Sequence, residues 1–187
     1  MALKGTITTS DYIEFDICKR VGMKLVVDEK TRTFGLYILT SIYTGLRMSD
    51  VLNIQWSILD NPTYTSREKK TGKAKTITLN SVLVEILSKC KNIDDTGFIF
   101  KSQKGTVYSK QSINRLMKAH FKNEVKSSHI SSHSLRKSFG NRVYISNGKT
   151  DAILHLLSEM FNHSSISITR KYLGLKQEQY DNIYLTL

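Results

Sequence analysis

The segment HSSISITRKYL, residues 163–173, places His163 nine positions before Tyr172. A tyrosine phenol can act as a nucleophile that forms a covalent ester, and a histidine can bind or move protons near neutral pH. Small hydroxyl residues and an arginine lie between them. The spacing alone also fits a short segment with one half-buried aromatic side chain, so other parts of the chain must decide between these interpretations.

Three earlier segments carry complementary side chains. Arg47 lies in YTGLRMSD, between the expected end of one helix and the start of the next, and Lys70 lies at a basic turn in KKTGK. His133 and Arg136 are three positions apart in HSLRKSF, on one face of an expected helix. Taken singly, each of these residues is more often a surface, capping or turn residue than a functional one.

Taken together, the order Arg, Lys, His-x-x-Arg, His and Tyr resembles the catalytic domain of the tyrosine recombinases, the phage integrase family. The segments TGLRMSD, KTGK, HSLRKSF and NHSSISITRKYLG carry the resemblance, which spans roughly residues 34–175. Where the family shows Leu-Gly before the histidine, this chain has Phe161-Asn162. Because asparagine tolerates a left-handed helix end, we expect the exchange to touch no reacting group.

The resemblance implies a site-specific DNA recombinase or integrase that cuts and rejoins strands by transesterification. Tyr172 would attack the phosphorus and expel a 5′-hydroxyl, leaving a 3′-phosphotyrosyl intermediate that conserves the energy of the broken bond. Arg47 and Arg136 would bind the non-bridging oxygens with forked donors. His163 would hydrogen-bond one of the same oxygens.

The resemblance assigns the proton transfers as well. Lys70, on the hairpin, would protonate the departing 5′-oxygen as general acid. His133 would position the phosphate and assist proton transfer at the tyrosine, and Asp50 would orient the arginine and histidine side chains. The implied reaction requires no metal and no cofactor, and the sequence has no clustered carboxylates of the kind that hold Mg²⁺.

Charge gives an independent indication of the partner. The chain has 187 residues and a net charge of +12 at pH 7, which favours a polyanion, with nucleic acid the first candidate. The resemblance implies that this nucleic acid is double-stranded DNA. Two basic clusters suit a surface that follows a phosphate backbone. They contain the candidate DNA-binding residues Arg67, Lys69, Lys73, Lys75, Lys110, Arg115 and Lys118. A solvated cationic face would give the same pattern, and the clusters do not choose between the two.

Other features limit the cellular context. Cys18 and Cys90 lie far apart without metal-ligand spacing, so we interpret them as buried thiols in a reducing compartment. No apolar run approaches the ~20 residues of a membrane span, and the N-terminus has no signal-peptide core. These features favour the cytoplasm, and the resemblance implies a bacterial, phage or mobile-element origin. His129 and His133 have zinc-pair spacing, but the glutamate of a metalloprotease motif is absent, which disfavours a metal site.

Hydrophobic periodicity predicts a mainly α fold with a small antiparallel β-hairpin, as in the catalytic domain of the tyrosine recombinases. The expected helices cover residues 10–26, 33–45, 49–56, 81–91, 109–125, 133–148, 150–161 and 165–173, and the hairpin covers residues 63–79. We expect a capping box from Asp11 and Glu14, an N-cap at Ser49, and a short strand or buried linker at 97–100.

The absence of repeats and of low-complexity linkers predicts one catalytic domain over residues 1–187, with residues 1–30 as a lead-in. These ~30 residues are too few for the separate N-terminal DNA-binding domain of the family, so we expect an excised domain or a naturally short member. Residues 178–187 resemble the family's C-terminal helix, which docks on a neighbouring protomer, although folding back on its own domain is equally open. The resemblance also implies a tetramer on DNA and leaves room for accessory DNA-bending proteins.

Two alternative functions share this fold. A type IB-like topoisomerase uses the same tyrosine chemistry, but that group usually carries a lysine in place of His133. A catalytically retired DNA-binding module would gain nothing from keeping the whole reactive set intact. A metal-dependent nuclease lacks ligands.

Overall fold

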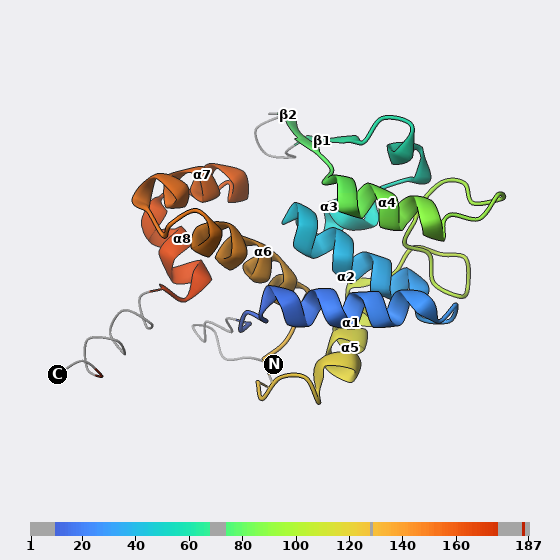
Figure 1. The fold of residues 1–187 in the computed structure, drawn as a ribbon, viewed down its shortest axis with the longest axis horizontal. Helices are drawn as coiled ribbons and strands as arrows, with labels where there is room; N and C mark the ends of the chain where they lie inside the picture. The colour runs from blue at the N-terminus through green and yellow to red at the C-terminus, as the bar shows by residue number, and fades with distance from the viewer. Residues whose placement is uncertain (1–9, 68–73, 128, 176–184, 186–187) are drawn as a thin grey trace.

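The computed structural model describes residues 10–67, 74–127, 129–175 and 185. Within them the chain forms helices, one two-stranded sheet and a short 3-10 helix (Figure 1). The α-helices are α1 (Phe15–Val27), α2 (Arg32–Thr44), α3 (Met48–Leu52), α4 (Ser81–Cys90), α5 (Lys110–Phe121), α6 (Ser132–Ser146), α7 (Asp151–Phe161) and α8 (Ile166–Leu173). The remaining elements are η1 (Trp56–Leu59), β1 (Thr63–Arg67) and β2 (Ala74–Thr78). The predicted fold class is confirmed.

Helix α2 is the centre of the larger hydrophobic core. Its residues from Phe34 to Ile42 are buried without interruption, and α1, α4 and α6 pack against it. Gly22 of α1 and Gly35 of α2 allow a close approach, since a Cβ on Gly35 would lie 2.8 Å from the Gly22 carbonyl oxygen. The predicted helix end is confirmed: Gly45 has a left-handed φ of 61°.

A second, smaller hydrophobic cluster joins α6, α7 and α8, which lie together on one side of the molecule in Figure 1. Helix α6 belongs to both clusters, because its Leu135 packs in the larger core and its Tyr144 in the smaller one. A capping box between Ser131 and Ser134 starts this helix. The position of α6 therefore fixes one cluster relative to the other.

The predicted hairpin is confirmed for the residues that the structure describes. Strands β1 and β2 pair antiparallel, with Tyr64 opposite Ile77 and Thr65 opposite Thr76. The hydroxyl groups of the Thr65–Thr76 pair are 2.9 Å apart. The expected turn near Gly72 lies outside the described residues.

The first helix begins later than the sequence predicts, and the expected capping box is wrong. Helix α1 starts at Phe15, and Glu14 makes no side-chain cap. Residues 10–14 lie outside the helix instead: the Asp11 amide donates to the His129 carbonyl, and the Asp11 carboxylate accepts a hydrogen bond from Ser127. These contacts with a distant segment replace the local capping interactions.

The expected helix over residues 49–56 is also wrong in its extent. Helix α3 begins at Met48 and ends at Leu52, so Ser49 is not its N-cap. The chain then leaves the helix because Gln55 pairs with Phe98, and the Trp56 amide donates to the Gly97 carbonyl at 2.9 Å. Residues 97–100 thus form a linker, and the expected burial is confirmed for Ile99 and Phe100, whereas Gly97 is exposed.

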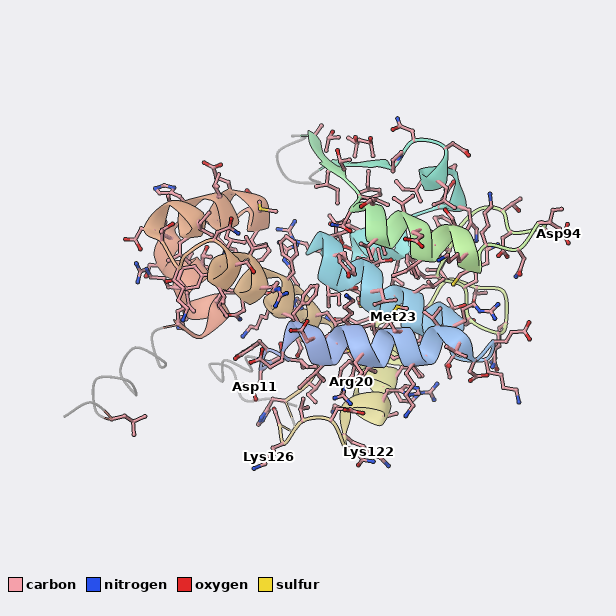
Figure 2. The ribbon with its side chains drawn as sticks, in the orientation of Figure 1. Asp11, Arg20, Met23, Asp94, Lys122 and Lys126 are labelled. Atoms are coloured by element: carbon pink, nitrogen blue, oxygen red, sulfur yellow. The ribbon has the colours of Figure 1, made fainter. Side chains whose placement is uncertain are left out.

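Exposed charged side chains surround the two cores (Figure 2). Arg20 of α1, labelled in Figure 2, bonds Glu124 just beyond α5 at 2.9 Å.

Cys18 is buried as predicted, and burial raises the pKa of its thiol to about 12. Cys90 is only half-buried. Across the described ranges, none of the helices has the length and apolar character needed to traverse a bilayer.

We expect Gly45→Ala to destabilise the protein by more than about 2 kcal/mol, because a left-handed L-residue costs ~1–2 kcal/mol and the new Cβ would overlap Phe139. A Cβ at this position would lie 2.2 Å from the Phe139 ring. Gly105→Ala is the matched control: its φ is 76°, with nothing within 4 Å. Urea unfolding should therefore give a smaller loss for Gly105→Ala, and equal losses would contradict the packing argument.

Candidate active site

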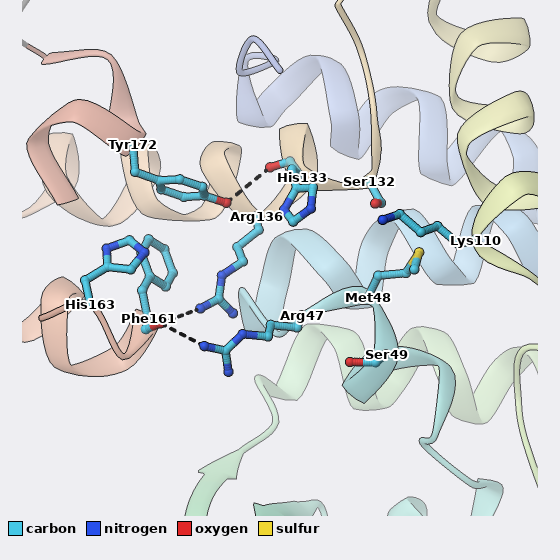
Figure 3. A pocket seen from close by; sticks show the side chains of 10 residues that line it. All are labelled: Arg47, Met48, Ser49, Lys110, Ser132, His133, Arg136, Phe161, His163 and Tyr172. Atoms are coloured by element: carbon cyan, nitrogen blue, oxygen red, sulfur yellow. Dashed lines mark hydrogen bonds between the residues drawn. The ribbon is translucent and has the colours of Figure 1, made fainter. Parts of the chain in front are cut away.

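A cleft of about 280 Å³ opens where α3, α5, α6, α7 and α8 meet (Figure 3). Five of the six predicted catalytic side chains line it, although they come from separate parts of the chain. The sixth, Lys70, lies outside the described residues. The lining residues are Arg47, Met48, Ser49, Lys110, Ser132, His133, Arg136, Phe161, His163 and Tyr172. No carboxylate occurs among these described residues, so the cleft is suited to an anion.

The two arginines share one acceptor, the carbonyl oxygen of Phe161. Arg47 donates to it from Nη2 at 3.3 Å, and Arg136 from Nη2 at 3.2 Å. Arg136 also donates from Nη1 to the Gly45 carbonyl at 2.5 Å. Burial lowers the pKa of Arg136 to about 10, so its guanidinium remains charged at neutral pH. A guanidinium has more N–H groups than these bonds use, which leaves donors for a ligand.

The Phe161 side chain contacts three of the reactive groups, contrary to the expectation that the family's Leu-Gly could be exchanged without touching them. The Arg136 guanidinium carbon lies 4.3 Å from the centre of the Phe161 ring. The rings of His163 and Tyr172 meet it edge-on, with centroids 5.6 and 5.5 Å away. The expectation for Asn162 is confirmed, since it ends α7 with a left-handed φ of 55°.

Tyr172 lies near the end of α8, with its hydroxyl turned into the cleft (Figure 3). The hydroxyl donates to the His133 carbonyl at 3.5 Å, a long hydrogen bond. Burial raises the pKa of the phenol to about 12, and the nearby charges of Arg136 and Arg47 oppose this rise. The side chain is therefore a half-buried, protonated phenol within reach of the solvent.

His163 is held by a neighbour on the same side of the cleft. Its Nδ1 lies 2.9 Å from the hydroxyl of Thr169, which is fully buried. This contact occupies Nδ1 and leaves Nε2 for another partner. Burial lowers the pKa of the imidazole, and Arg136 and Arg47 lower it further. His163 is therefore neutral at pH 7.

His133, in the first turn of α6, lines the opposite wall. Desolvation lowers its pKa, with smaller contributions from the charges of Lys110, Arg136 and Lys137. Lys110, predicted as a general DNA-binding residue, lies in this cleft. Its position at the start of α5 could not be linked to the other segments by spacing alone.

Lys137 is a neighbour of the tyrosine that sequence reasoning missed. It is only 6% exposed, and its ammonium group lies 5.2 Å from the centre of the Tyr172 ring. Burial lowers the pKa of Lys137, and the charge of Asp11 partly offsets this effect. Its place directly after Arg136 was the only signal in the sequence.

Asp50 acts on the site through its charge. It raises the pKa of Arg136 against the larger lowering by burial. Within the described ranges, Arg47 and Arg136 direct their hydrogen bonds to the backbone carbonyls of Phe161 and Gly45 rather than to Asp50. Its predicted orienting role stays a prediction.

The other basic candidates divide into two groups. Lys69, Lys70 and Lys73 lie outside the described residues, while Arg67 and Lys75 belong to β1 and β2 and their side chains are not described. Arg115 and Lys118 are exposed on α5 and do not line the cleft.

A family model described as "Phage integrase family" matches residues 26–179. The chain belongs to this family. The probable integrase/recombinase YoeC of Bacillus subtilis (strain 168) is 29% identical over 159 residues, 82% of this chain and 83% of its own length. The tyrosine recombinase XerC of Natranaerobius thermophilus is 30% identical over 54% of this chain and 32% of its own length. The family and these relatives identify a tyrosine-type site-specific recombinase, and the topoisomerase and retired-module alternatives are not favoured.

Solved structures agree on the fold. The XerA recombinase superposes with a TM-score of 0.66 at 19% identity, over 97% of this chain and 66% of the other. The XerH recombinase, in a post-cleavage complex with its palindromic difH substrate, superposes with a TM-score of 0.68 at 19% identity, over 94% and 53%. The chain spans about a third to a half of the XerC recombinases it matches, at 32% and 49% of their lengths.

We expect Arg47→Ala to raise the pKa of His163 toward its usual 6.5, because the substitution removes a cation that opposes protonation. The shift should be partial, since burial is the larger cause. An NMR titration of the imidazole signals measures it. Arg142→Ala, which removes an exposed cation elsewhere on α6, should leave the titration unchanged. An unchanged midpoint in Arg47→Ala would contradict the electrostatic account of the cleft.

Proposed function

We propose that this chain breaks and rejoins DNA through a covalent bond between Tyr172 and a 3′-phosphate. The observation that carries the proposal is the convergence of a tyrosine hydroxyl, two linked guanidinium groups and two neutral histidines in one cleft that no carboxylate lines among the described residues. A phosphodiester matches this cleft in charge. It also offers an electrophilic phosphorus to the phenol.

The scissile phosphate binds between the arginines and the tyrosine. Arg47 and Arg136 donate to its non-bridging oxygens with the N–H groups that the Phe161 carbonyl does not use. These donors stabilise the negative charge that accumulates as the phosphorus becomes five-coordinate. Because both guanidinium groups are already fixed, little reorganisation is needed when the charge develops.

One bond to phosphorus forms and one breaks. The Tyr172 oxygen bonds to phosphorus, the bond from phosphorus to the 5′-oxygen breaks, and the 3′-phosphate stays on the enzyme. The phenol proton passes toward His133, whose lowered pKa keeps its imidazole neutral and able to accept. The departing 5′-oxygen receives a proton, for which Lys70 remains the predicted donor. Attack by a second 5′-hydroxyl reverses these steps and rejoins the strand.

Thr169 sets the role of His163 in this scheme. A neutral imidazole donates to a phosphate oxygen only if its proton is on Nε2, and this requires Nδ1 to accept. The Thr169 hydroxyl, 2.9 Å from Nδ1, is placed to donate to it. Thr169 is thus a positioning residue that acts through the histidine.

We also propose the DNA partner, the assembly and the cellular location of this chain. The partner is double-stranded DNA, which is supported by relatives solved with DNA, among them the XerH recombinase and the Tn1549 transposon integrase. The chain is one catalytic domain that acts with further copies of itself on paired sites, with accessory DNA-bending proteins where the site requires them. It works in the cytoplasm of a bacterium, as part of a mobile element. Residues 178–187 dock on a neighbouring copy; apart from Leu185 they lie outside the described residues.

The first test is trapping of the covalent intermediate. The substrate is a pool of nicked duplexes of randomised sequence. Cleavage close to a nick releases a short fragment that carries the 5′-hydroxyl, so the reaction cannot reverse and the phosphotyrosyl adduct accumulates. We expect a protein–DNA band on denaturing electrophoresis that persists in EDTA, because side chains supply the cations of the cleft. Tyr172→Phe should abolish it, since the nucleophilic oxygen is removed. An adduct formed by Tyr172→Phe would refute the assignment. In a separate assay on closed circular DNA, release of supercoils without strand exchange would favour a topoisomerase.

The second test concerns Thr169. Thr169→Val keeps the shape but removes the hydroxyl, and we expect adduct formation to slow about tenfold, the effect of one lost hydrogen bond of ~1.4 kcal/mol. Thr169→Ser is the matched control, because it keeps the hydroxyl and should retain most of the rate. The pH profile separates this role from a packing role: only Thr169→Val should shift the acid limb set by His163. Equal rates for the two variants would exclude the positioning role.

A further inference from the structure

A second cavity, of about 480 Å³, opens on another side of α5 and is separate from the active-site cleft. Its walls come from the turn between α1 and α2, from residues 102–108, and from the first half of α5. Three cationic side chains line it: Lys30, Lys104 and Arg115. Hydroxyl groups of serine and threonine residues supply most of the remaining polar lining.

The charge of this cavity is not compensated by the described part of the chain. None of its described lining residues is an acid, and the salt bridges among the described residues involve none of its three cations. The two acids next to Lys30 do not line this cavity. The Asp28 carboxylate accepts from Thr31, and Glu29 lines a different cavity.

Hydrogen bonds fix the backbone that carries Lys104 and Arg115. Lys101 and Val107 pair as an isolated bridge, the Ser102 amide donates to the Thr106 carbonyl at 2.7 Å, and the turn closes at Gly105, with a φ of 76°. This tight turn presents Lys104. Helix α5 starts beside it, capped by the Ser109 side chain. The first-turn amides of this helix have no intrahelical acceptors, so its N-terminus adds partial positive charge.

Helix α5 connects the second cavity to the active site. Lys110 lines the catalytic cleft, whereas Ser112 and Arg115 line the second cavity. Ser112 and Arg115 follow Lys110 by two and five positions, so their side chains are rotated by ~140–200° around the helix axis from that of Lys110. The start of α5 therefore separates the two cavities. Lys110 and Arg115 are ~7.5 Å apart along the axis.

We propose that the second cavity binds the phosphodiester backbone of the DNA strand next to the scissile phosphate. The strand would cross the N-terminus of α5, with the scissile phosphate in the catalytic cleft and a neighbouring phosphate between Lys104 and Arg115. The inference rests on the proposed function for the identity of the polyanion. The cavity supplies affinity and direction for the strand and takes no part in bond breaking.

The test measures how DNA binding depends on salt. Fluorescence anisotropy with a random-sequence duplex gives the slope of log affinity against log salt concentration, and the Tyr172→Phe background prevents covalent trapping. The double variant Lys104→Ala/Arg115→Ala should lower the slope by about 1.8, that is ~0.9 for each phosphate that the protein no longer neutralises. Lys104→Arg/Arg115→Lys keeps both charges and should restore the slope.

The matched control removes two charges from another surface. Lys19→Ala/Lys24→Ala changes two exposed lysines of α1, a helix whose described residues line neither of these two cavities. The control should leave the slope nearly unchanged, and a fall equal to that of the cavity variant would overturn the proposal, as would an unchanged slope in the cavity variant.

Adduct trapping with Tyr172 present separates this inference from the proposed function. Lys104→Ala/Arg115→Ala should need a higher protein concentration than the unsubstituted protein for half-maximal adduct formation. If the unsubstituted protein forms the adduct and the slope is unchanged in Lys104→Ala/Arg115→Ala, only the DNA-binding role of the cavity is refuted. A lowered slope without any adduct from the unsubstituted protein would refute the proposed chemistry and leave the cavity as a DNA-binding site.

Discussion

Two positive charges converge on one oxygen atom at the centre of this protein. Arg47 and Arg136 would repel each other in a partly desolvated cleft, and the Phe161 carbonyl accepts a hydrogen bond from both. That carbonyl is available because α7 ends there: Asn162 turns left-handed, and the last carbonyls of a helix have no intrahelical partner. The Gly45 carbonyl, at the end of α2, receives the third bond. Both acceptors lie at helix C-termini, where the helix dipole is negative.

This arrangement explains why the fold has two hydrophobic clusters with the reactive groups between them. Helix α2 belongs to the larger cluster and α7 to the smaller, and α6 carries Arg136 across the boundary. A change in the angle of α6 would pull the guanidinium away from one of its two acceptors. Packing in both clusters and hydrogen bonding at the boundary therefore stabilise the same geometry. The aromatic contacts of Phe161 extend this order to His163 and Tyr172.

The sequence predicted the features that depend on local chemistry. The helix end at Gly45, the left-handed Asn162 and the hairpin all follow from neighbouring residues. The features that failed depend on distant partners. Asp11 bonds the segment before α6 instead of capping α1, and Gln55 lies beyond the end of α3 and pairs with Phe98. The reactive residues show the same division. Their identity followed from family resemblance, whereas no spacing rule connects Lys137 with the ring of Tyr172, or the Phe161 carbonyl with Arg47.

The protonation states in the cleft follow from one balance. Burial favours the neutral forms of Tyr172, His133 and His163, whereas Arg136 stays charged, because its unperturbed pKa is so high that a fall to about 10 does not discharge it. The positive charge of the cleft without a ligand therefore comes from arginines, which do not exchange protons near neutral pH. The two histidines beside them stay neutral and can accept a proton. A phosphate entering this cleft meets fixed positive charge without having to displace a proton. The cations then also favour the phenolate that attack requires, since Arg136 and Arg47 already oppose the rise in the pKa of Tyr172. The same two arginines thus bind the anion and ease the loss of the phenol proton, and their common carbonyl acceptor keeps them together for both tasks.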